Sequence, residues 1–524
     1  MSADFVVRNG TVVDGTGAPP VRADVVVANG RIDAIGAVDA VDVPVLDATG
    51  CLVTPGFIDI HSHSDFTLLL DPRAVSAVRQ GVTLEVIGNC GHGCFPIRDA
   101  HLARSAIYGF DDDVPLSWSS LPGYLDRLEE ARPAINVLTL VPNGQLRLAA
   151  VGLHDRPATE SERAEMGRQL ENALTEGAWG YSTGLEYAAE RGVPPEEIEA
   201  LCRIVARHGA LYATHTRDRD DQAVGAVVEA LETARRAGVR LQVSHLVPRS
   251  GSELGHACIV AVEQAREDGL DVAFDMHTRL FGFTFLATVL PAWAVDAGPV
   301  RLAELLAEPD ARAAIKGHRS ILSAGNDWSR IMLLDNDVWP DYGRRDVAGI
   351  AAERGQEPLD TVLDLLAADT EHLHRLMALI HCHTEEQQRE AFAHPLCMPG
   401  SDATTLAPDG RLATSVFHGA YTWASWFFRF MVRETQLLTA EEAVHRLTGR
   451  PAERLGLTDR GVLRVGAPAD VAVFDPGVFS ERGTAFEPNL LAAGMRHVVV
   501  NGVVTLRDGL ETGDRAGAVL RRQS

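Results

Sequence analysis

Residues that bind metals stand at the carboxyl ends of several apolar segments of this chain. In the run Phe-Ile-Asp-Ile-His-Ser-His at 57–63, strand alternation turns both imidazoles to the same side. Four later segments end in a cysteine, two histidines and an aspartate. Imidazole, thiolate and carboxylate are the ligands that zinc prefers. The candidate ligands are His61, His63, Cys90, His215, His245 and Asp402.

Each of these residues alone has an ordinary structural explanation. A single histidine at a strand end is usually a satisfied structural residue, and a single cysteine usually packs as a small apolar side chain. The pair Ser401-Asp402 alone is typical of a helix N-cap. Their occurrence at the ends of five separate segments has no such explanation, and it predicts a metal site.

The segments that carry these residues alternate with helical stretches, which predicts an α/β fold, a parallel (β/α)8 TIM-like barrel. In such a barrel the active site lies at the carboxyl ends of the strands. Nine candidate strands compete for eight places, so the region 282–375 must contain an insertion or carry an extra strand. The candidates are 57–63, 82–90, 135–144, 178–185, 210–217, 241–246, 272–277, 376–383 and 396–402.

Both ends of the chain are rich in β-branched residues. The runs 5–10 and 24–30 each close with Asn-Gly, a strong hairpin signal, and the C-terminal end repeats the style. Neither end is large enough to bury a core alone. We therefore predict a small composite β-sandwich from residues 1–56 plus 463–524, a hydrolase barrel over 57–462, and an inserted subdomain at about 282–345 over the barrel mouth.

Composition excludes several classes of function. The net charge of −24 argues against binding to nucleic acid or an anionic membrane. The start lacks a basic region followed by an apolar run, and no apolar run spans a bilayer. Seven scattered cysteines are typical of free thiols in a reducing cytoplasm. We expect a cytoplasmic enzyme with a small-molecule substrate, and the sequence leaves its oligomeric state open.

The motifs resemble a known family. The run Val-Thr-Pro-Gly-Phe-Ile-Asp-Ile-His-Ser-His at 53–63 resembles the first-strand signature of the amidohydrolase superfamily. Five later motifs resemble those of the D-aminoacylases, the N-acyl-D-amino-acid deacylases. They are Gly-Asn-Cys-Gly at 88–91, Tyr-Ser-Thr-Gly-Leu at 181–185, Tyr-Ala-Thr-His-Thr-Arg-Asp at 212–218, Ser-His at 244–245 and Gly-Ser-Asp at 400–402. The resemblance runs from about residue 4 to residue 505.

This resemblance implies a zinc enzyme that hydrolyses a small N-acyl-D-amino acid or a related acyl-amine. It implies one tight zinc held by Cys90, His215 and His245. The remaining ligands, His61, His63 and Asp402, would complete that site or hold a second, weaker metal. Asp402 would act as general base and then as general acid.

A carboxylated lysine bridges two metals in many members of the superfamily. Lys316 is the only lysine of this chain, and it falls in the predicted insertion. This position argues against a carbamate bridge, and the same resemblance implies that Cys90 takes that place. Cys94, four residues further on, is the alternative thiol.

The substrate-binding positions depart from the family pattern. Where the family carries a lysine after the strand-six histidine, this chain has Val247, and Phe283 replaces a serine. The strand-seven end reads His-Thr-Arg at 277–279 instead of Tyr-Pro-Tyr, and the run 419–423 lacks the family's arginine. Arg279 either binds a substrate carboxylate or forms a surface salt bridge. The candidate substrate-binding residues are Arg217, Tyr187, His277 and Arg279.

Two alternatives remain at this stage. The changed substrate positions motivate hydrolysis of a cyclic amide, such as a hydantoin or lactam, or deamination of a heterocycle. A non-catalytic relative on the same barrel is the other alternative, which the presence of all six ligands disfavours. A second His-x-His, at His381 and His383, lacks a matching set of ligands and is interpreted as supporting or structural.

Overall fold

A computed structural model describes residues 3–38, 43–154, 156–249, 251–318, 320, 322–323, 326–415 and 417–523. The chain divides into two compact units. The first comprises Met1–Val247, Ser252–Thr278 and Gln388–Ser524, and the second comprises Pro248–Gly251 and Arg279–Gln387. The second unit covers the insertion expected at about 282–345 and continues beyond it on the C-terminal side.

The first unit contains the predicted barrel. Over the described ranges, eight parallel strands follow one another in the order β8-β9-β10-β11-β12-β13-β14-β18. The first and last strands meet at their carboxyl ends, where Ser62 bridges Ala403 and the Asp402 amide donates to the His61 carbonyl at 2.9 Å. The strands are β8 Phe57–Asp59, β9 Val82–Ile87, β10 Asn136–Pro142, β11 Gly180–Gly184, β12 Leu211–His215, β13 Arg240–Val243, β14 Val272–His277 and β18 Cys397–Gly400.

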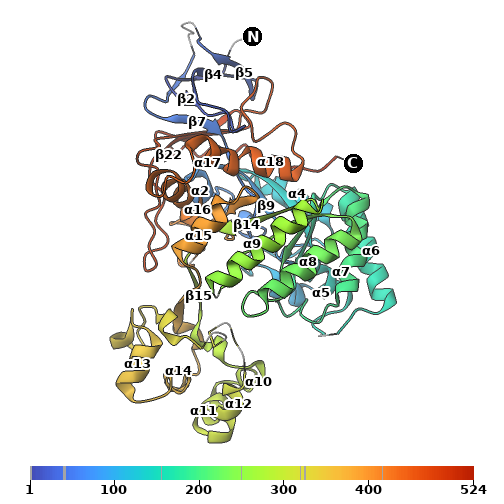
Figure 1. The fold of residues 1–524 in the computed structure, drawn as a ribbon, viewed down its shortest axis with the longest axis vertical. Coiled ribbons are helices and arrows are strands. Elements are labelled where there is room, and N and C mark those ends of the chain that lie inside the picture. Colours follow the sequence, from blue (N-terminus) through green and yellow to red (C-terminus); the bar gives the residue numbers. More distant parts are fainter. Residues whose placement is uncertain are drawn as a thin grey trace. The chain divides into compact units, whose positions relative to one another are not determined.

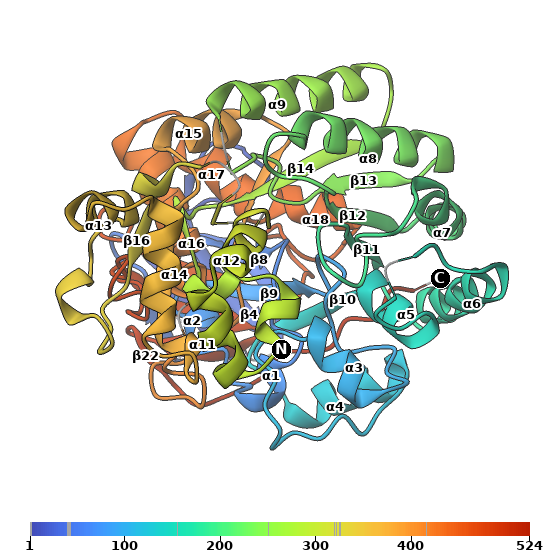
Figure 2. The same ribbon diagram turned by 90° about the horizontal axis from the view of Figure 1, so that it is seen from below.

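Helices surround these strands, as Figure 2 shows for α7, α8 and α9. Helix α7, Pro195–Arg207, buries Ile198, Leu201 and Val205 at helical spacing against the barrel. Helix α6, Glu160–Thr175, begins with a capping box between Thr159 and Glu162. Helix α15, Glu385–Ala393, has residues in both units. The other α-helices of the first unit are α1 Thr67–Leu70, α2 Val75–Val78, α3 Ala100–Ala103, α4 Leu121–Ala131, α5 Asn143–Ala150, α8 Ala223–Ala237, α9 Ser252–Glu267, α16 His418–Phe428, α17 Ala440–Leu447 and α18 Gly449–Leu455.

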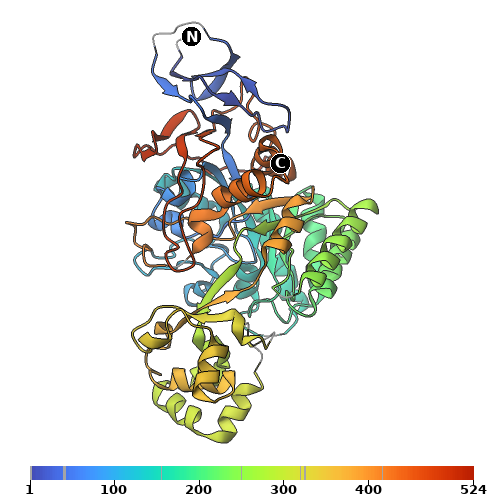
Figure 3. The ribbon, with the colours of Figure 1, turned by 60° about the vertical axis from the view of Figure 1, so that its left-hand side comes forward.

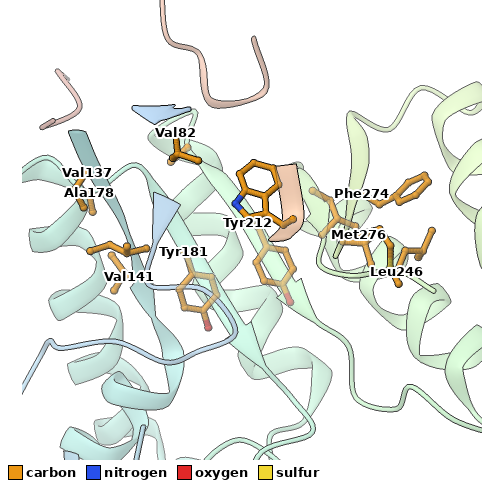
Figure 4. Close-up of a cluster of buried hydrophobic side chains, with 14 of the residues drawn as sticks. Val82, Val137, Val141, Ala178, Tyr181, Tyr212, Leu246, Phe274 and Met276 are labelled. Atoms are coloured by element: carbon orange, nitrogen blue, oxygen red, sulfur yellow. The ribbon is translucent and has the colours of Figure 1, made fainter. Parts of the chain in front are cut away.

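The barrel strands are buried on both faces, which is why they read as continuous apolar runs. Every residue of β9, β10 and β14 is buried. Between the strands and the helices lies a large apolar core, part of which Figure 4 shows around Val82, Tyr181 and Phe274. This packing fixes the strand ends from which the candidate ligands project.

Strands from both chain ends form a β-sandwich within the first unit. One sheet has the order β5-β4-β1-β6, and the other has the order β22-β21-β20-β19-β7-β2-β3. Strand β7 pairs antiparallel with β19, so the two ends lie side by side, blue beside red in Figure 3. The strands are β1 Phe5–Arg8, β2 Thr11–Val12, β3 Val21–Arg22, β4 Asp24–Ala28, β5 Arg31–Gly36, β6 Val45–Asp47, β7 Leu52–Pro55, β19 Val471–Phe474, β20 Met495–Val500, β21 Val503–Arg507 and β22 Leu510–Glu511.

The last residues of the chain leave the sandwich and run along the barrel. Val519 bridges Val137 of β10, and the Leu520 amide donates to the Val137 carbonyl at 2.7 Å. The indole of Trp179 donates to the Leu520 carbonyl at 2.8 Å. Residues 515–523, which the sequence assigned to the sandwich, therefore contact the barrel.

The second unit has a small sheet and a core of its own. The segment 376–383, a candidate barrel strand, forms β17, Met377–His381, which pairs antiparallel with β15 and β16 in this unit. That assignment to the barrel was wrong, because a short apolar run does not reveal which sheet it joins. The other elements, labelled in part in Figure 1, are β15 Phe281–Phe285, β16 Ile331–Leu333, α10 Ala292–Val295, α11 Pro299–Ala307, α12 Pro309–Lys316, α13 Val347–Arg354 and α14 Pro358–Ala367.

No helix among the described residues is both long enough and apolar enough to cross a membrane.

Candidate metal centre and active site

Three of the candidate ligands stand on strained backbone just after barrel strands. Cys90 follows β9 with φ 53°, His245 follows β13 with φ 36°, and Asp402 follows β18 with φ 43°. A side chain other than glycine adopts this left-handed conformation at a cost of about 1–3 kcal/mol. Such strain persists where the surrounding structure requires it, and here it accompanies donor atoms of His245 and Asp402 that each lie within 4.8 Å of the Cys90 sulfur.

The structure brings all six candidate ligands together in two groups that share one sulfur. In the first group, Nε2 of His61 lies 3.2 Å from Cys90 Sγ and 3.5 Å from Asp402 Oδ1. Nε2 of His63 lies 3.2 Å from the same Asp402 oxygen. These four side chains offer donor atoms that all lie within 4.8 Å of one another.

Cys90, His215 and His245 form the second group. Nε2 of His245 lies 3.5 Å from Cys90 Sγ. The three donor atoms lie within 4.8 Å of one another, and all three residues are buried. Because Cys90 belongs to both groups, its sulfur is placed to serve two adjacent positions.

The donor spacing fits a divalent metal. Zinc bonds of about 2.0–2.1 Å to nitrogen and 2.3 Å to sulfur, at tetrahedral angles, separate neighbouring donors by about 3.3–3.6 Å. From the Cys90 sulfur, the separation of 3.5 Å to His245 lies within this range and that of 3.2 Å to His61 lies just below it. Both the kinds of donor and their spacing therefore suit a metal of the zinc type.

Electrostatics keep the central sulfur in its metal-binding form. Burial opposes charge on Cys90, but the imidazoles of His61, His215 and His245 lower its pKa well below the usual value. Burial also opposes charge on His61, whereas Cys90 and Asp275 raise the pKa of this imidazole well above its usual value. A thiolate thus stands at the centre of the group, and the thiolate is the form that binds metals.

Asp402 is the most accessible of the six candidate ligands. Its side chain is 17% exposed, whereas that of His63 is 3% exposed and that of His61 is fully buried. Burial lowers the pKa of His63, but the hydrogen bond with Asp402 raises it. The resulting pKa is about 9. A carboxylate with an open edge beside buried ligands is placed to exchange a proton with a bound molecule.

Two carboxylates that the sequence reasoning missed orient the candidate ligands. Asp275 Oδ1 lies 3.0 Å from Nδ1 of His61 and accepts from the backbone amide of His245 at 2.8 Å. Glu186 Oε2 lies 2.8 Å from Nε2 of His215. Carboxylates of this kind fix the ring orientation and the tautomer of metal-binding histidines. Asp275 is a charged residue inside the apolar run of β14, and this feature of the sequence could have revealed it.

The alternative thiol and the single lysine are in neither metal-binding group of the described residues. Cys94 is buried near Tyr124, and burial raises the pKa of its thiol well above the usual value. Neither metal-binding group of the described residues includes it. Lys316 belongs to α12 of the second unit, and its amine pairs with Asp360 at 2.5 Å.

The predicted substrate-binding residues have different surroundings. The Tyr187 hydroxyl lies 3.4 Å from Nδ1 of His215, and the ring of His277 lies 6.4 Å from that of His245, so both stand beside the metal-binding groups. Arg217 instead pairs with Glu229 at 2.8 Å and donates to the Val193 carbonyl. These contacts do not support a role for Arg217 in substrate binding.

Arg279, the fourth candidate, is the first residue after the break between the units and belongs to the second one. His383, from the second His-x-His, belongs there too. Their proposed roles stay predictions.

Aromatic side chains form a continuous wall beside the ligands. The ring of Tyr108 lies 4.6 Å from that of His63 and 4.8 Å from that of His92. The ring of His92 in turn lies 4.4 Å from that of Tyr187. His92, Tyr108 and Tyr187 are each partly exposed, so the wall offers ring surface beside His63 and His215.

The chain matches the model of one protein family, described as the amidohydrolase family, over residues 44–506. It belongs to the amidohydrolase family. This membership and the full-length relatives confirm the sequence-based identification of the chain as a hydrolase that resembles the D-aminoacylases.

Relatives within the amidohydrolase family match the whole chain. An N-acyl-D-glutamate deacylase of Alcaligenes xylosoxydans xylosoxydans is 34% identical, over 99% of this chain and 97% of its own. The structure of an N-acyl-D-glutamate deacylase from Bordetella bronchiseptica, complexed with zinc and a phosphonate mimic of the tetrahedral intermediate, has 32% identity and a TM-score of 0.79, over 99% of this chain and 100% of that one. A D-aminoacylase structure, described for its binuclear metal centre, has 30% identity and the same TM-score and coverage.

The cyclic-amide alternative is not supported by these relatives. A D-hydantoinase structure from Thermus sp. has 16% identity and a TM-score of 0.56, which shows a shared fold alone. The more similar full-length relatives are deacylases of N-acyl-D-amino acids.

Proposed function

We propose that this protein hydrolyses the amide bond of small N-acyl-D-amino acids, with zinc held by the residues around Cys90. The observation that carries the proposal is the pair of donor groups that share the Cys90 sulfur at the carboxyl ends of the barrel strands. The relatives suggest the substrate class, because they are named as deacylases of N-acyl-D-glutamate and match the chain over its full length.

Cys90, His215 and His245 would hold the tightly bound zinc, as three buried donors around one position. His61, His63 and Asp402 would complete that site or hold a second, weaker metal. When bound, zinc polarises a carbonyl and makes water more acidic.

Asp402 is the group that moves protons in this proposal. Its partly exposed carboxylate would take a proton from water while the water oxygen bonds to the acyl carbon. The carbon–nitrogen bond then breaks, and Asp402 returns the proton to the leaving nitrogen. The carboxylic acid formed then gives its proton to the amine, so the products are a carboxylate and a D-amino acid with a charged amino group, and atoms and charges balance. Tyr187 lies beside His215 and His277 beside His245, where both would contact the substrate, and the Glu186 carboxylate would hold the ring of His215 in place.

The test is hydrolysis of N-acetyl-D-glutamate, N-acetyl-D-aspartate and N-acetyl-D-leucine by zinc-loaded protein, with the L-enantiomers and a hydantoin as comparisons. We expect release of the free D-amino acid from at least one D-substrate and none from the hydantoin. Absence of turnover on every acyl-D-amino acid by protein that holds zinc would contradict the proposal.

The Asp402→Asn variant tests the proposed proton transfer. General acid–base groups contribute about 10²–10⁴-fold, so kcat should fall within that range. The tight zinc should remain, because Cys90, His215 and His245 are unchanged. Metal analysis together with steady-state kinetics measures both, and unchanged kcat would remove Asp402 from its proposed role.

A further inference from the structure

A small pocket lined by arginines lies at the end of the barrel opposite the metal-binding groups. Arg240 begins β13, Asp271 precedes β14 and Leu396 precedes β18, so this is the amino-terminal end of the strands. The pocket has a volume of about 220 Å³ and belongs entirely to the first unit. Its apolar floor includes Ala273 and Met398.

Three guanidinium groups of this pocket share one carboxylate. Asp271 Oδ1 accepts from Arg266 at 3.0 Å and from Arg454 at 2.6 Å, and Oδ2 accepts from Arg240 at 2.9 Å. Burial, together with the charges of Arg240 and Arg266, lowers the pKa of Arg454 to about 10 in spite of Asp271. One carboxylate therefore leaves part of the positive charge uncompensated.

A fourth arginine stands outside this network. Arg450 donates to the Pro395 carbonyl at 2.6 Å and has no carboxylate partner among the described residues. The residue as a whole is partly buried. The structural pairing around Asp271 accounts for the other three arginines but not for Arg450.

The charge of this pocket is opposite to that of the whole molecule. Its lining holds four arginines against Asp271 and the exposed Glu453, a surplus of two positive charges. The whole chain carries a net charge of −24. A concave basic pocket on an acidic protein attracts small anions selectively, because the surrounding surface repels larger polyanions.

We propose that this pocket binds a doubly charged oxyanion of the phosphate class. Guanidinium groups donate two parallel hydrogen bonds to phosphate oxygens, and arginine is the residue best suited to this recognition. The volume of about 220 Å³ lies below the roughly 300–1,000 Å³ of sites for drug-sized ligands. It therefore suits inorganic phosphate or a small phosphomonoester, with the carbon chain of the ester against Ala273 and Met398.

Calorimetric titration of the full-length, zinc-loaded protein with sodium phosphate tests this proposal, against sodium chloride of equal ionic strength. We expect saturable binding of phosphate alone. Arg450→Ala should weaken it about tenfold or more, since a hydrogen bond to a charged group contributes about 1.5–3 kcal/mol. Arg203→Ala, on the exposed face of α7 where Arg203 pairs with Glu199, is the matched control and should bind as the unmodified protein does.

Phosphate could also bind at the zinc, and the variants separate the two places. If phosphate binds at the zinc, the Arg450→Ala variant should bind phosphate as tightly as the unmodified protein does. That result would overturn the proposal. The proposal would also be overturned if phosphate showed no saturable binding to the unmodified protein. The same conclusion would follow if Arg203→Ala lost as much phosphate affinity as Arg450→Ala. Arg266 lies in the last turn of α9 and its side chain is half exposed. If Arg450→Ala folds poorly, Arg266→Ala is the second variant, and it should also weaken phosphate binding. Glycerol phosphate in a parallel titration distinguishes an ester from inorganic phosphate, and deacylase activity should be the same in all variants.

Discussion

Cys90 lies at the centre of the candidate site because both donor groups include its sulfur. The thiolate is favoured by three neighbouring imidazoles, and the backbone of Cys90 is held in a left-handed conformation that aims the side chain at them. At the residue scale, the site therefore depends on one thiol more than on any single histidine.

Replacement of Cys90 by alanine should abolish tight zinc binding and hydrolysis together. Removal of a direct donor should cost more than the roughly 10–100-fold in affinity that loss of an outer partner costs. Metal content of the purified variant, followed by titration with zinc, measures the effect. Cys94→Ala is the control, since Cys94 is buried but lies outside both groups. Retention of tight zinc by Cys90→Ala would contradict the assignment.

Glu186 gives a second prediction at this scale. Its carboxylate lies 2.8 Å from Nε2 of His215, and a neutral amide at that position would orient the ring less strongly. Glu186→Gln should lower zinc affinity by about tenfold and lower kcat, with Glu186→Asp restoring part of both. Competition with a zinc-binding dye measures the affinity.

A surface pair of the same geometry is the control for Glu186. Glu171, on α6, lies 2.8 Å from Nε2 of His208, the residue that follows α7, and neither belongs to the site. Glu171→Gln should leave zinc affinity and kcat unchanged. Equal behaviour of the two variants would show that Glu186 acts on general stability only.

At the scale of elements, close packing between loops sets the position of Cys90. Gly91 has φ 70°, and a methyl group there would collide with the Glu190 carboxylate. Glu190 is buried and accepts from the Gly184 amide at 3.0 Å and from Asn143 at 2.6 Å. It thereby joins the loop after β9 to the end of β11 and the start of α5.

Replacement of Gly91 by alanine should therefore destabilise the protein and displace Cys90. We expect a loss of about 1–3 kcal/mol in the free energy of unfolding, with a fall in zinc affinity. Gly225→Ala is the matched control, since nothing lies within 4 Å of the added methyl group in α8. That control should gain about 0.5–1 kcal/mol, as expected for glycine in a helix. Urea unfolding and zinc titration measure both variants, and equal effects would contradict the packing argument.

At the scale of the whole molecule, the two chain ends complete the first unit. The sandwich joins β7 to β19 across more than four hundred residues of chain, and the tail reaches β10. Removal of residues 515–524 should leave the metal-binding residues in place but expose the end of the barrel that the tail covers.

This truncation should lower the free energy of unfolding by about 2–4 kcal/mol, from several backbone hydrogen bonds of about 0.5–1.5 kcal/mol each. Differential scanning calorimetry should show a lower midpoint, whereas zinc content should stay unchanged. Removal of residues 523–524 alone is the control and should have no effect. Unchanged stability of the longer truncation would show that the tail does not contribute.

The sequence by itself determined the donor types, the strand periodicity and the family of this protein. Those features are local, because a motif such as His61-Ser62-His63 carries both its alternation and its chemistry. Only the tertiary structure decided which groups meet. Asp275 lies 214 positions from His61, and no local pattern connects them. The strand pattern also does not reveal that Arg217 pairs with Glu229, only 12 positions further on in α8. The long-range dependence also applies to β17, whose apolar run fits a barrel strand equally well but pairs with β15. Pairing across such distances depends on the packing of the whole chain, and that packing decides which residues become part of the site.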